Sequence, residues 1–325
     1  MTLAPYAMAA AKPGPPAVLH EVPFQPVAPG PGEVLIRHRA IGVNFIDCYF
    51  RSGLYPWPVE RDLIPGSEAA GVIEAVGDGV KDLTSGQRVA YTLPNFSYAT
   101  HRTIAAQHVV AVPDGVSDDV AASVMLKGLT VRYLVKDSYA VKPGDRVLFH
   151  AAAGGVGLIA GQWLKALGVS AMGTAGGPDK GALARAHGFA AVIDYRAADF
   201  ATEAKRLVPE GFHVVYDSVG KDTLARSLTC LRRHGTLVNF GQSSGPVTDF
   251  KISDLAAGSH HLTRPVLFHF TSDRAWLTRA AAELFGLIRE GALKVTTHTA
   301  ALRDVAQVHS QLESRQTTGS MVLIP

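Results

Sequence analysis

The stretch that decides the fold is LFHAAAGGVGLIAGQW, residues 148–163, in which an apolar strand runs into a glycine cluster and then into an apolar helix. Loops that bind the pyrophosphate of a dinucleotide follow the pattern G-x-G-x-x-G between a strand and a helix. Here the three pattern positions hold Ala152, Gly154 and Gly157, with Gly155 and Val156 between the last two. The second glycine admits the pyrophosphate and the third lets the helix pack closely, whereas alanine is tolerated at the first position if its φ is negative. The stretch therefore predicts a dinucleotide loop.

Strands and helices alternate around this loop. We expect strands at 145–150, 170–175, 190–194, 213–218 and 236–241, with helices at about 155–167 and 178–187 and from about 200 and 222. Such alternation is typical of a doubly wound parallel sheet, so the fold class is α/β.

The first third of the chain has a different pattern. Short β-forming runs at 32–44, 69–80, 86–91 and 108–113 are separated by Gly and Pro, which indicates an irregular β-barrel. A helix is expected from Ser117, another ends near Gly291, and the last residues, 319–325, are expected to form a strand. A closing strand after the nucleotide domain suggests that the chain returns to the first domain. A length of 325 residues is consistent with two domains.

Composition excludes several classes of protein. The chain is 47% hydrophobic and 18% charged, with a net charge of +3, which is ordinary for a globular protein and too weakly basic for nucleic acid. No apolar run reaches the 18 or so residues that a membrane span needs. The two cysteines, Cys48 and Cys230, cannot form a disulfide framework, and no signal peptide is recognisable, so we expect a cytoplasmic protein.

The residues after the second strand of the alternating region indicate which dinucleotide binds. NAD enzymes place Asp or Glu there, on the ribose 2′-hydroxyl. Residues 173–177 hold no acid, and Lys180 follows them. Because a 2′-phosphate needs space and a positive partner, this pattern favours NADPH. The alternative is that Lys180 is a solvated helix residue and the site does not discriminate.

Several motifs together resemble one family over nearly the whole chain. They are GVNFIDCYFRSGLYP, GSEAAGVIEAVG, LKGLTVRYL, HAAAGGVGLIA, VVYDSVG and LESRQTTGSMVLIP. This chain resembles the zinc-independent, NADPH-dependent quinone oxidoreductases of the medium-chain dehydrogenase/reductase superfamily, the branch that includes zeta-crystallin. The resemblance implies a homodimer, with a GroES-like catalytic domain at 1–125 and 268–325 and a Rossmann domain at 126–267.

The resemblance also implies site residues. Lys180 and Tyr195 would hold the 2′-phosphate, and Arg315 would lie near the cofactor or form a surface salt bridge. The remaining implied cofactor contacts are Asn44, Phe45, Ile46, Thr130, Gly173, Ser218, Phe240 and Gly241.

Zinc dehydrogenases of the same superfamily use a cysteine and a histidine that this sequence lacks. Asn44 stands at the cysteine position and Ser67 at the histidine position, while Glu68 is retained. One carboxylate does not make a zinc site. Cys48 lies four residues too late to replace the thiolate, and the pair His260-His261 lacks ligand spacing and is expected in a solvated loop. We therefore expect no metal.

Without a metal, the substrate must accept hydride easily, as a quinone does. We expect Asn44 to bind a carbonyl oxygen, and Tyr49 or Tyr55 to stabilise or protonate the developing oxyanion, although either tyrosine could simply be packed. Asp47 is expected to be a structural cap rather than a supporting group of the site. One alternative is an enoyl or 2-alkenal double-bond reductase with the same cofactor. Another, from a different class, is an RNA-binding or crystallin-like structural role, which the low charge disfavours.

Overall fold

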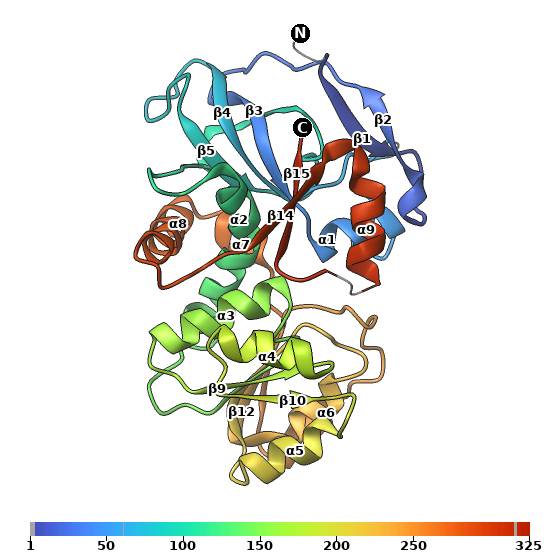
Figure 1. The fold of residues 1–325 in the computed structure, drawn as a ribbon, viewed down its shortest axis with the longest axis vertical. Coiled ribbons are helices and arrows are strands. Elements are labelled where there is room, and N and C mark those ends of the chain that lie inside the picture. Colours follow the sequence, from blue (N-terminus) through green and yellow to red (C-terminus); the bar gives the residue numbers. More distant parts are fainter. Residues whose placement is uncertain (1–3, 61, 315–316) are drawn as a thin grey trace. The chain divides into compact units, whose positions relative to one another are not determined.

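The computed structural model describes residues 4–60, 62–314 and 317–325, and the chain divides into two compact units (Figure 1). Unit 1 comprises Met1–Leu129, Phe268–Arg289 and Val295–Pro325, and unit 2 comprises Thr130–Leu267 and Glu290–Lys294. None of the described helices is both long enough and apolar enough to cross a bilayer.

Unit 2 is built around a six-stranded parallel sheet in the order β10-β9-β8-β11-β12-β13. Its strands are β8 (Val147–Phe149), β9 (Ala171–Ala175), β10 (Ala191–Asp194), β11 (Phe212–Asp217), β12 (Leu231–Asn239) and β13 (His261–Thr263). Helices α3 (Gly155–Ala166) and α4 (Pro178–Ala186) cover one face, and α5 (Phe200–Leu207) and α6 (Leu224–Leu228) cover the other (Figure 1). The strand order reverses between β8 and β11, and ligands of such sheets bind beyond the strand ends at this point.

Unit 1 is mainly antiparallel and contains a seven-stranded sheet in the order β14-β15-β3-β4-β5-β7, with β6 also paired to β3. The strands of this sheet are β3 (Glu33–Gly42), β4 (Glu68–Val76), β5 (Arg88–Thr92), β6 (His101–Ala105), β7 (Val109–Ala111), β14 (Thr297–Ala301) and β15 (Ser320–Ile324). Strands β1 (Tyr6–Ala10) and β2 (Leu19–Pro23) form a separate pair. The helices that lie wholly or mostly in unit 1 are α1 (Phe45–Ser52), α2 (Asp118–Tyr133), α7 (Leu267–Thr271), α8 (Arg274–Arg289) and α9 (Val305–Glu313).

These two architectures confirm the predicted α/β class and the alternating parallel sheet. The closing strand is also confirmed, because β15 pairs with β3 and returns the chain to unit 1. Three differences stand out. Residues 45–52 form helix α1. Strands β1, β2, β6 and β14 and helices α7 and α9 were not expected either, and His261 lies in edge strand β13 rather than in a loop. Strand β6 starts with polar residues, HRT, which carry little of the alternation that marks a strand.

Candidate active site

The glycine loop between β8 and α3 has the geometry that its sequence predicts. Ala152 does not have a positive φ; the left-handed residue of the turn is Ala151, at φ +54°. Gly154 is the N-cap of α3. A Cβ at Gly157 would lie 2.4 Å from the carbonyl oxygen of Ala151, so only glycine lets the helix start this close to the loop. The first N–H groups of α3 are thus presented to a phosphate, together with the positive end of the helix dipole.

The alanine that replaces the first glycine is accommodated by a second glycine. Ala152 is fully buried, and a Cβ built at Gly173 in the neighbouring strand β9 would lie 2.4 Å from the Ala152 methyl group. Any larger residue at 173 would therefore collide with the loop. Gly173, predicted as a cofactor contact, acts here by making room for Ala152.

The carboxyl end of β9 is lined by glycines and basic or hydroxyl side chains. A Cβ at Gly176 would lie 2.6 Å from the hydroxyl of Tyr195 and 3.0 Å from Nε of Arg196. Tyr195 is exposed, and Lys180 lies in the first turn of α4. The Asp194 carboxylate accepts hydrogen bonds from the N–H groups of Gly177 and Arg196, and these bonds lower the pKa of Asp194. The edge therefore brings cationic and hydroxyl donors close to two glycines, and such donors suit a 2′-phosphate.

The loops after β11 and β12 are tied to each other. Asp217 is buried and accepts bonds from the backbone N–H groups of Val219 and Gly220, which shapes the turn that carries Ser218. A Cβ at Gly241 would lie 2.6 Å from the Ser218 carbonyl oxygen. The Phe240 ring packs on Phe149, with centroids 5.6 Å apart. The predicted residues Ser218, Phe240 and Gly241 thus lie together at the strand ends, next to the switch point.

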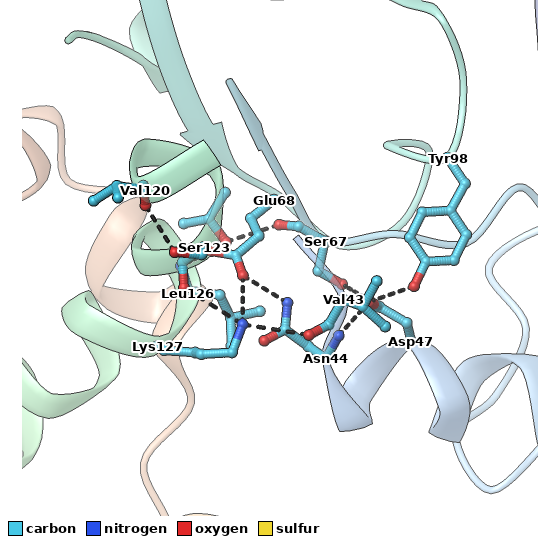
Figure 2. Close-up of polar contacts among 11 residues, drawn as sticks. Val43, Asn44, Asp47, Ser67, Glu68, Tyr98, Val120, Ser123, Leu126 and Lys127 are labelled. Carbon is cyan, nitrogen blue, oxygen red and sulfur yellow. Dashed lines mark hydrogen bonds and ion pairs between the residues drawn. The ribbon is translucent and has the colours of Figure 1, made fainter. Parts of the chain in front are cut away.

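In unit 1, the turn from β3 into α1 carries Asn44, the N-cap of α1. Its side-chain Nδ2 donates to Oε1 of Glu68 at 2.8 Å, and the same oxygen accepts from Nζ of Lys127 at 3.0 Å (Figure 2). All three side chains are buried. The Glu68 carboxylate can lie this close to the turn because residue 42 is glycine: a Cβ there would lie 2.4 Å from Oε1 of Glu68.

Asp47 lies one turn further along α1 and is fully buried. Its carboxylate accepts from the Asn44 backbone N–H at 2.9 Å, the Ser67 hydroxyl at 2.6 Å and the Tyr98 hydroxyl at 2.9 Å (Figure 2). Burial raises the pKa of Asp47 to about 7 despite these three donors. The residue is thus a structural cap that fixes the start of α1, as the sequence analysis favoured.

A chain of hydrogen bonds continues from Asp47 to α9. The Tyr98 hydroxyl lies 2.9 Å from Nε2 of His309, whose Nδ1 lies 3.5 Å from Sγ of Cys48. Burial lowers the pKa of His309 to about 3, so its ring is neutral near pH 7. Because Tyr98 gives its only proton to Asp47, Nε2 of His309 donates to Tyr98, and Nδ1 accepts from the Cys48 thiol. Burial also raises the pKa of Cys48, which leaves a packed, unreactive thiol.

The predicted tyrosines lie beside each other on the aromatic side of this turn. The ring centroids of Tyr49 and Tyr55 are 5.3 Å apart, and Phe45 packs on Tyr49 at 6.3 Å. The Tyr55 backbone N–H donates to the Tyr49 carbonyl at 3.1 Å, which folds the loop after α1 back on the helix. Phe45 is exposed, and both tyrosines are half-buried. The cluster presents aromatic faces with hydroxyl groups, a suitable surface for a flat ring.

The residues at the zinc positions do not form a metal site. Both oxygens of Glu68 are occupied, Oε1 by Lys127 and Asn44 and Oε2 by the Leu126 N–H. Asn44 and Ser67 supply neither thiolate nor imidazole. Within residues 4–60, 62–314 and 317–325, no three His, Cys, Asp or Glu side chains are grouped so that they could hold a metal ion.

The structure therefore gathers most of the predicted residues into two groups, one in each unit. Thr130 is buried in α2, Ile46 is half-buried in α1, and Arg315 lies outside the described residues. Two residues of these groups were not predicted: Arg196, although it directly follows Tyr195, and Lys127, although it lies within the motif LKGLTVRYL. Position alone could have suggested Arg196, whereas the pairing of Lys127 with Glu68 joins residues 59 positions apart.

Comparison with known proteins matches both halves of the chain. A model described as alcohol dehydrogenase GroES-like domain matches residues 30–114, and one described as zinc-binding dehydrogenase matches residues 155–282. A quinone oxidoreductase of Pseudomonas aeruginosa is 47% identical over 316 residues, which cover 96% of this chain and 97% of that protein. The structure of Escherichia coli quinone oxidoreductase complexed with NADPH has a TM-score of 0.95 at 44% identity, over 98% of this chain and all of the other. A 2-haloacrylate reductase of a Burkholderia species is 42% identical over 308 residues, 92% of each chain.

Proposed function

Because this chain belongs to the quinone oxidoreductases of the medium-chain dehydrogenase/reductase superfamily, we propose that it reduces quinones by hydride transfer from NADPH without a metal ion. Membership confirms the resemblance drawn from the sequence motifs and the GroES-like first domain that it implied. We assign the catalytic domain to 1–125 and 268–325 and the cofactor domain to 126–267.

One observation carries the choice of cofactor. The end of β9 has no carboxylate of its own, and its glycines lie against Tyr195 and Arg196, with Lys180 in the next helix turn. A ribose 2′-phosphate would take this position and accept charge-assisted hydrogen bonds from these groups, whereas NADH carries no phosphate there. The pyrophosphate would lie on Gly154, Gly155, Val156 and Gly157, and Ser218, Phe240 and Gly241 would line the neighbouring loops.

When bound, NADPH supplies a hydride from its nicotinamide. The quinone gains this hydride and one proton and becomes a hydroquinone, so no metal is needed to stabilise an alkoxide. In our proposal the Asn44 amide donates to a quinone oxygen, and a hydroxyl of Tyr49 or Tyr55 stabilises or protonates the oxyanion. The aromatic faces of Phe45 and Tyr49 position the ring.

A second function is favoured by the similarity to the Burkholderia 2-haloacrylate reductase, whose name describes reduction of an acrylate. A parallel assay separates the two functions. Oxidation of NADPH is followed with simple quinones, with 2-alkenals and with 2-haloacrylate, and each acceptor is repeated with NADH. We expect turnover with NADPH and quinones; exclusive activity on the unsaturated carbonyl compounds would replace quinone reduction with double-bond reduction.

We also propose that the protein is a cytoplasmic homodimer. Strand β13 is the last strand of the sheet order in unit 2, and exposed Ile252 lies in the segment before it. An edge strand and an exposed apolar side chain are both suited to contact with a second copy. The free, buried Cys48 and Cys230 are consistent with a reducing compartment. Analytical ultracentrifugation tests the dimer; a monomer at micromolar concentration would contradict it.

A further inference from the structure

A buried ion pair lies directly behind the turn that carries Asn44. Nζ of Lys127 donates to Oε1 of Glu68 at 3.0 Å, to the Val43 carbonyl at 3.3 Å and to the Ser123 carbonyl at 3.4 Å (Figure 2). These three bonds account for all three ammonium protons. Lys127 therefore has no proton left to give to a substrate, and it is not a proton donor.

Two of the contacts of the pair converge on adjacent residues of one turn. Lys127 holds the carbonyl of Val43, and Glu68 accepts the side-chain amide of Asn44. From the other side, the carboxylate of Asp47 accepts the backbone N–H of Asn44. The backbone and the side-chain amide of Asn44 are thus fixed from opposite directions. One N–H of Nδ2 donates to Glu68, and the second N–H takes no part in that bond.

Stability alone is a weak reason for such a pair. Desolvation of two charges costs about as much as their attraction returns, so well-packed apolar residues often serve equally well. In zinc dehydrogenases, bonds between a metal and its ligands fix this region of the site. Here Glu68 is bonded to an ammonium group, which supplies a positive charge and directional bonds at the same carboxylate.

We propose that Lys127 and Glu68 are positioning residues for the reduction, and that their ion pair holds the Asn44 amide in the orientation that binds the substrate oxygen. Neither residue touches the substrate; both act through Asn44. The inference rests on the proposed hydride transfer, and its test includes a measurement that needs no turnover.

The first measurement is a double-mutant cycle on the rate constant of hydride transfer, followed as a single turnover of NADPH with saturating quinone. Lys127→Met and Asn44→Ala are each expected to slow this step by about 10- to 100-fold, because a small misplacement of a positioned group has an effect of this order. If Lys127 acts through Asn44, the double variant is no slower than Asn44→Ala alone. Losses that multiply would overturn the proposal. The surface pair on α5 offers a control: Arg206→Met, which removes the partner of Glu203, should leave the rate unchanged.

The second measurement is hydrogen exchange of the Asn44 side-chain amide by NMR, assigned by its absence in Asn44→Ala. It is expected to be protected in the wild type and in Arg206→Met, and to exchange at least about tenfold faster in Lys127→Met. Equal protection in Lys127→Met would overturn the proposal whether or not the protein reduces quinones. A wild type that is inactive on quinones, but whose amide loses protection in Lys127→Met, would instead overturn the proposed substrate alone.

Lys127→Met leaves a buried carboxylate without its partner and could fail to fold. Lys127→Met/Glu68→Gln removes both charges with little change of shape and keeps the protein testable. If the pair positions Asn44, this variant keeps a wild-type melting temperature but transfers hydride at least about tenfold more slowly. A melting temperature and a rate that both equal the wild type would overturn the proposal.

Discussion

The hydroxyl of Tyr98 lies 2.9 Å from Nε2 of His309, a residue 211 positions further along the chain. This bond connects the turn at the start of α1, through Asp47, to helix α9. Since Tyr98 has no second proton to give, the imidazole donates through Nε2, and it must be uncharged for its Nδ1 to accept from the Cys48 thiol. The start of the helix that carries Tyr49 is thus coupled to the protonation of a buried histidine.

Acid should therefore destabilise the protein through His309. Its pKa is about 3 in the folded protein, against about 6.5 in an unfolded chain, so the unfolded state binds the extra proton first. The stability that the protein has with a neutral His309 is fully present above pH 6.5 and is lost as the pH falls towards 3. In that window His309 contributes a slope of about 1.4 kcal/mol per pH unit to the free energy of unfolding.

Urea unfolding at several pH values checks this slope. His309→Gln should be less sensitive to pH by about that amount, while Ser310→Ala, on the exposed side of the same helix, should keep the wild-type slope. Asp47 opposes the trend, because its raised pKa makes the folded state the better proton binder between about pH 4 and 7. Asp47 is present in all three proteins, so the difference reports His309; equal slopes would contradict the prediction.

The glycine loop should not tolerate one additional methyl group. In Gly157→Ala the Cβ would lie 2.4 Å from a backbone oxygen, so α3 or the loop must shift and the cofactor should bind at least about tenfold more weakly. Gly286, in the last turn of α8, has no atom within 4 Å of the equivalent Cβ, and Gly286→Ala should be neutral or stabilise the helix by up to about 1 kcal/mol. Titration of NADPH by its fluorescence, together with thermal melts, compares the two. Unchanged affinity in Gly157→Ala would place the pyrophosphate elsewhere.

Discrimination between NADPH and NADH should depend on Lys180 and Arg196. Lys180→Ala and Arg196→Ala each remove one charge-assisted contact with the 2′-phosphate. Each should raise the KM for NADPH by roughly ten- to a hundredfold and leave the KM for NADH nearly constant. Lys165→Ala, in the last turn of the neighbouring helix α3, is the matched control and should change neither value. Steady-state kinetics with both cofactors measures the ratio. If the KM values for NADPH and NADH rise together in a variant, the substituted residue is not part of the phosphate site.

The sequence predicted the parts of this molecule that depend on local pattern. Strand, loop and helix at 145–167 follow from glycine spacing and apolar periodicity, and Lys180 follows from the missing acid. The sequence did not reveal the buried cluster around Glu68, because its members come from segments far apart in the chain. Nor did it reveal α1, since residues 45–52 begin with aromatic and β-branched side chains that favour strands. Asp47 caps the start of this helix, and Gly53, in the αL conformation, ends it. Both signals depend on the backbone conformation of the flanking turns, which the sequence pattern did not reveal.

Purified protein should contain far less than one zinc ion per chain. A catalytic zinc site needs three protein ligands, and Glu68, the carboxylate retained from the zinc dehydrogenases, already binds an ammonium and two N–H groups. Elemental analysis after purification without chelator measures the content. Dialysis against a chelator should leave quinone reduction unchanged, and added zinc should not increase it. Stoichiometric zinc whose removal abolishes activity would mean that Lys127 leaves Glu68 in the working enzyme and that the reaction needs a Lewis acid after all.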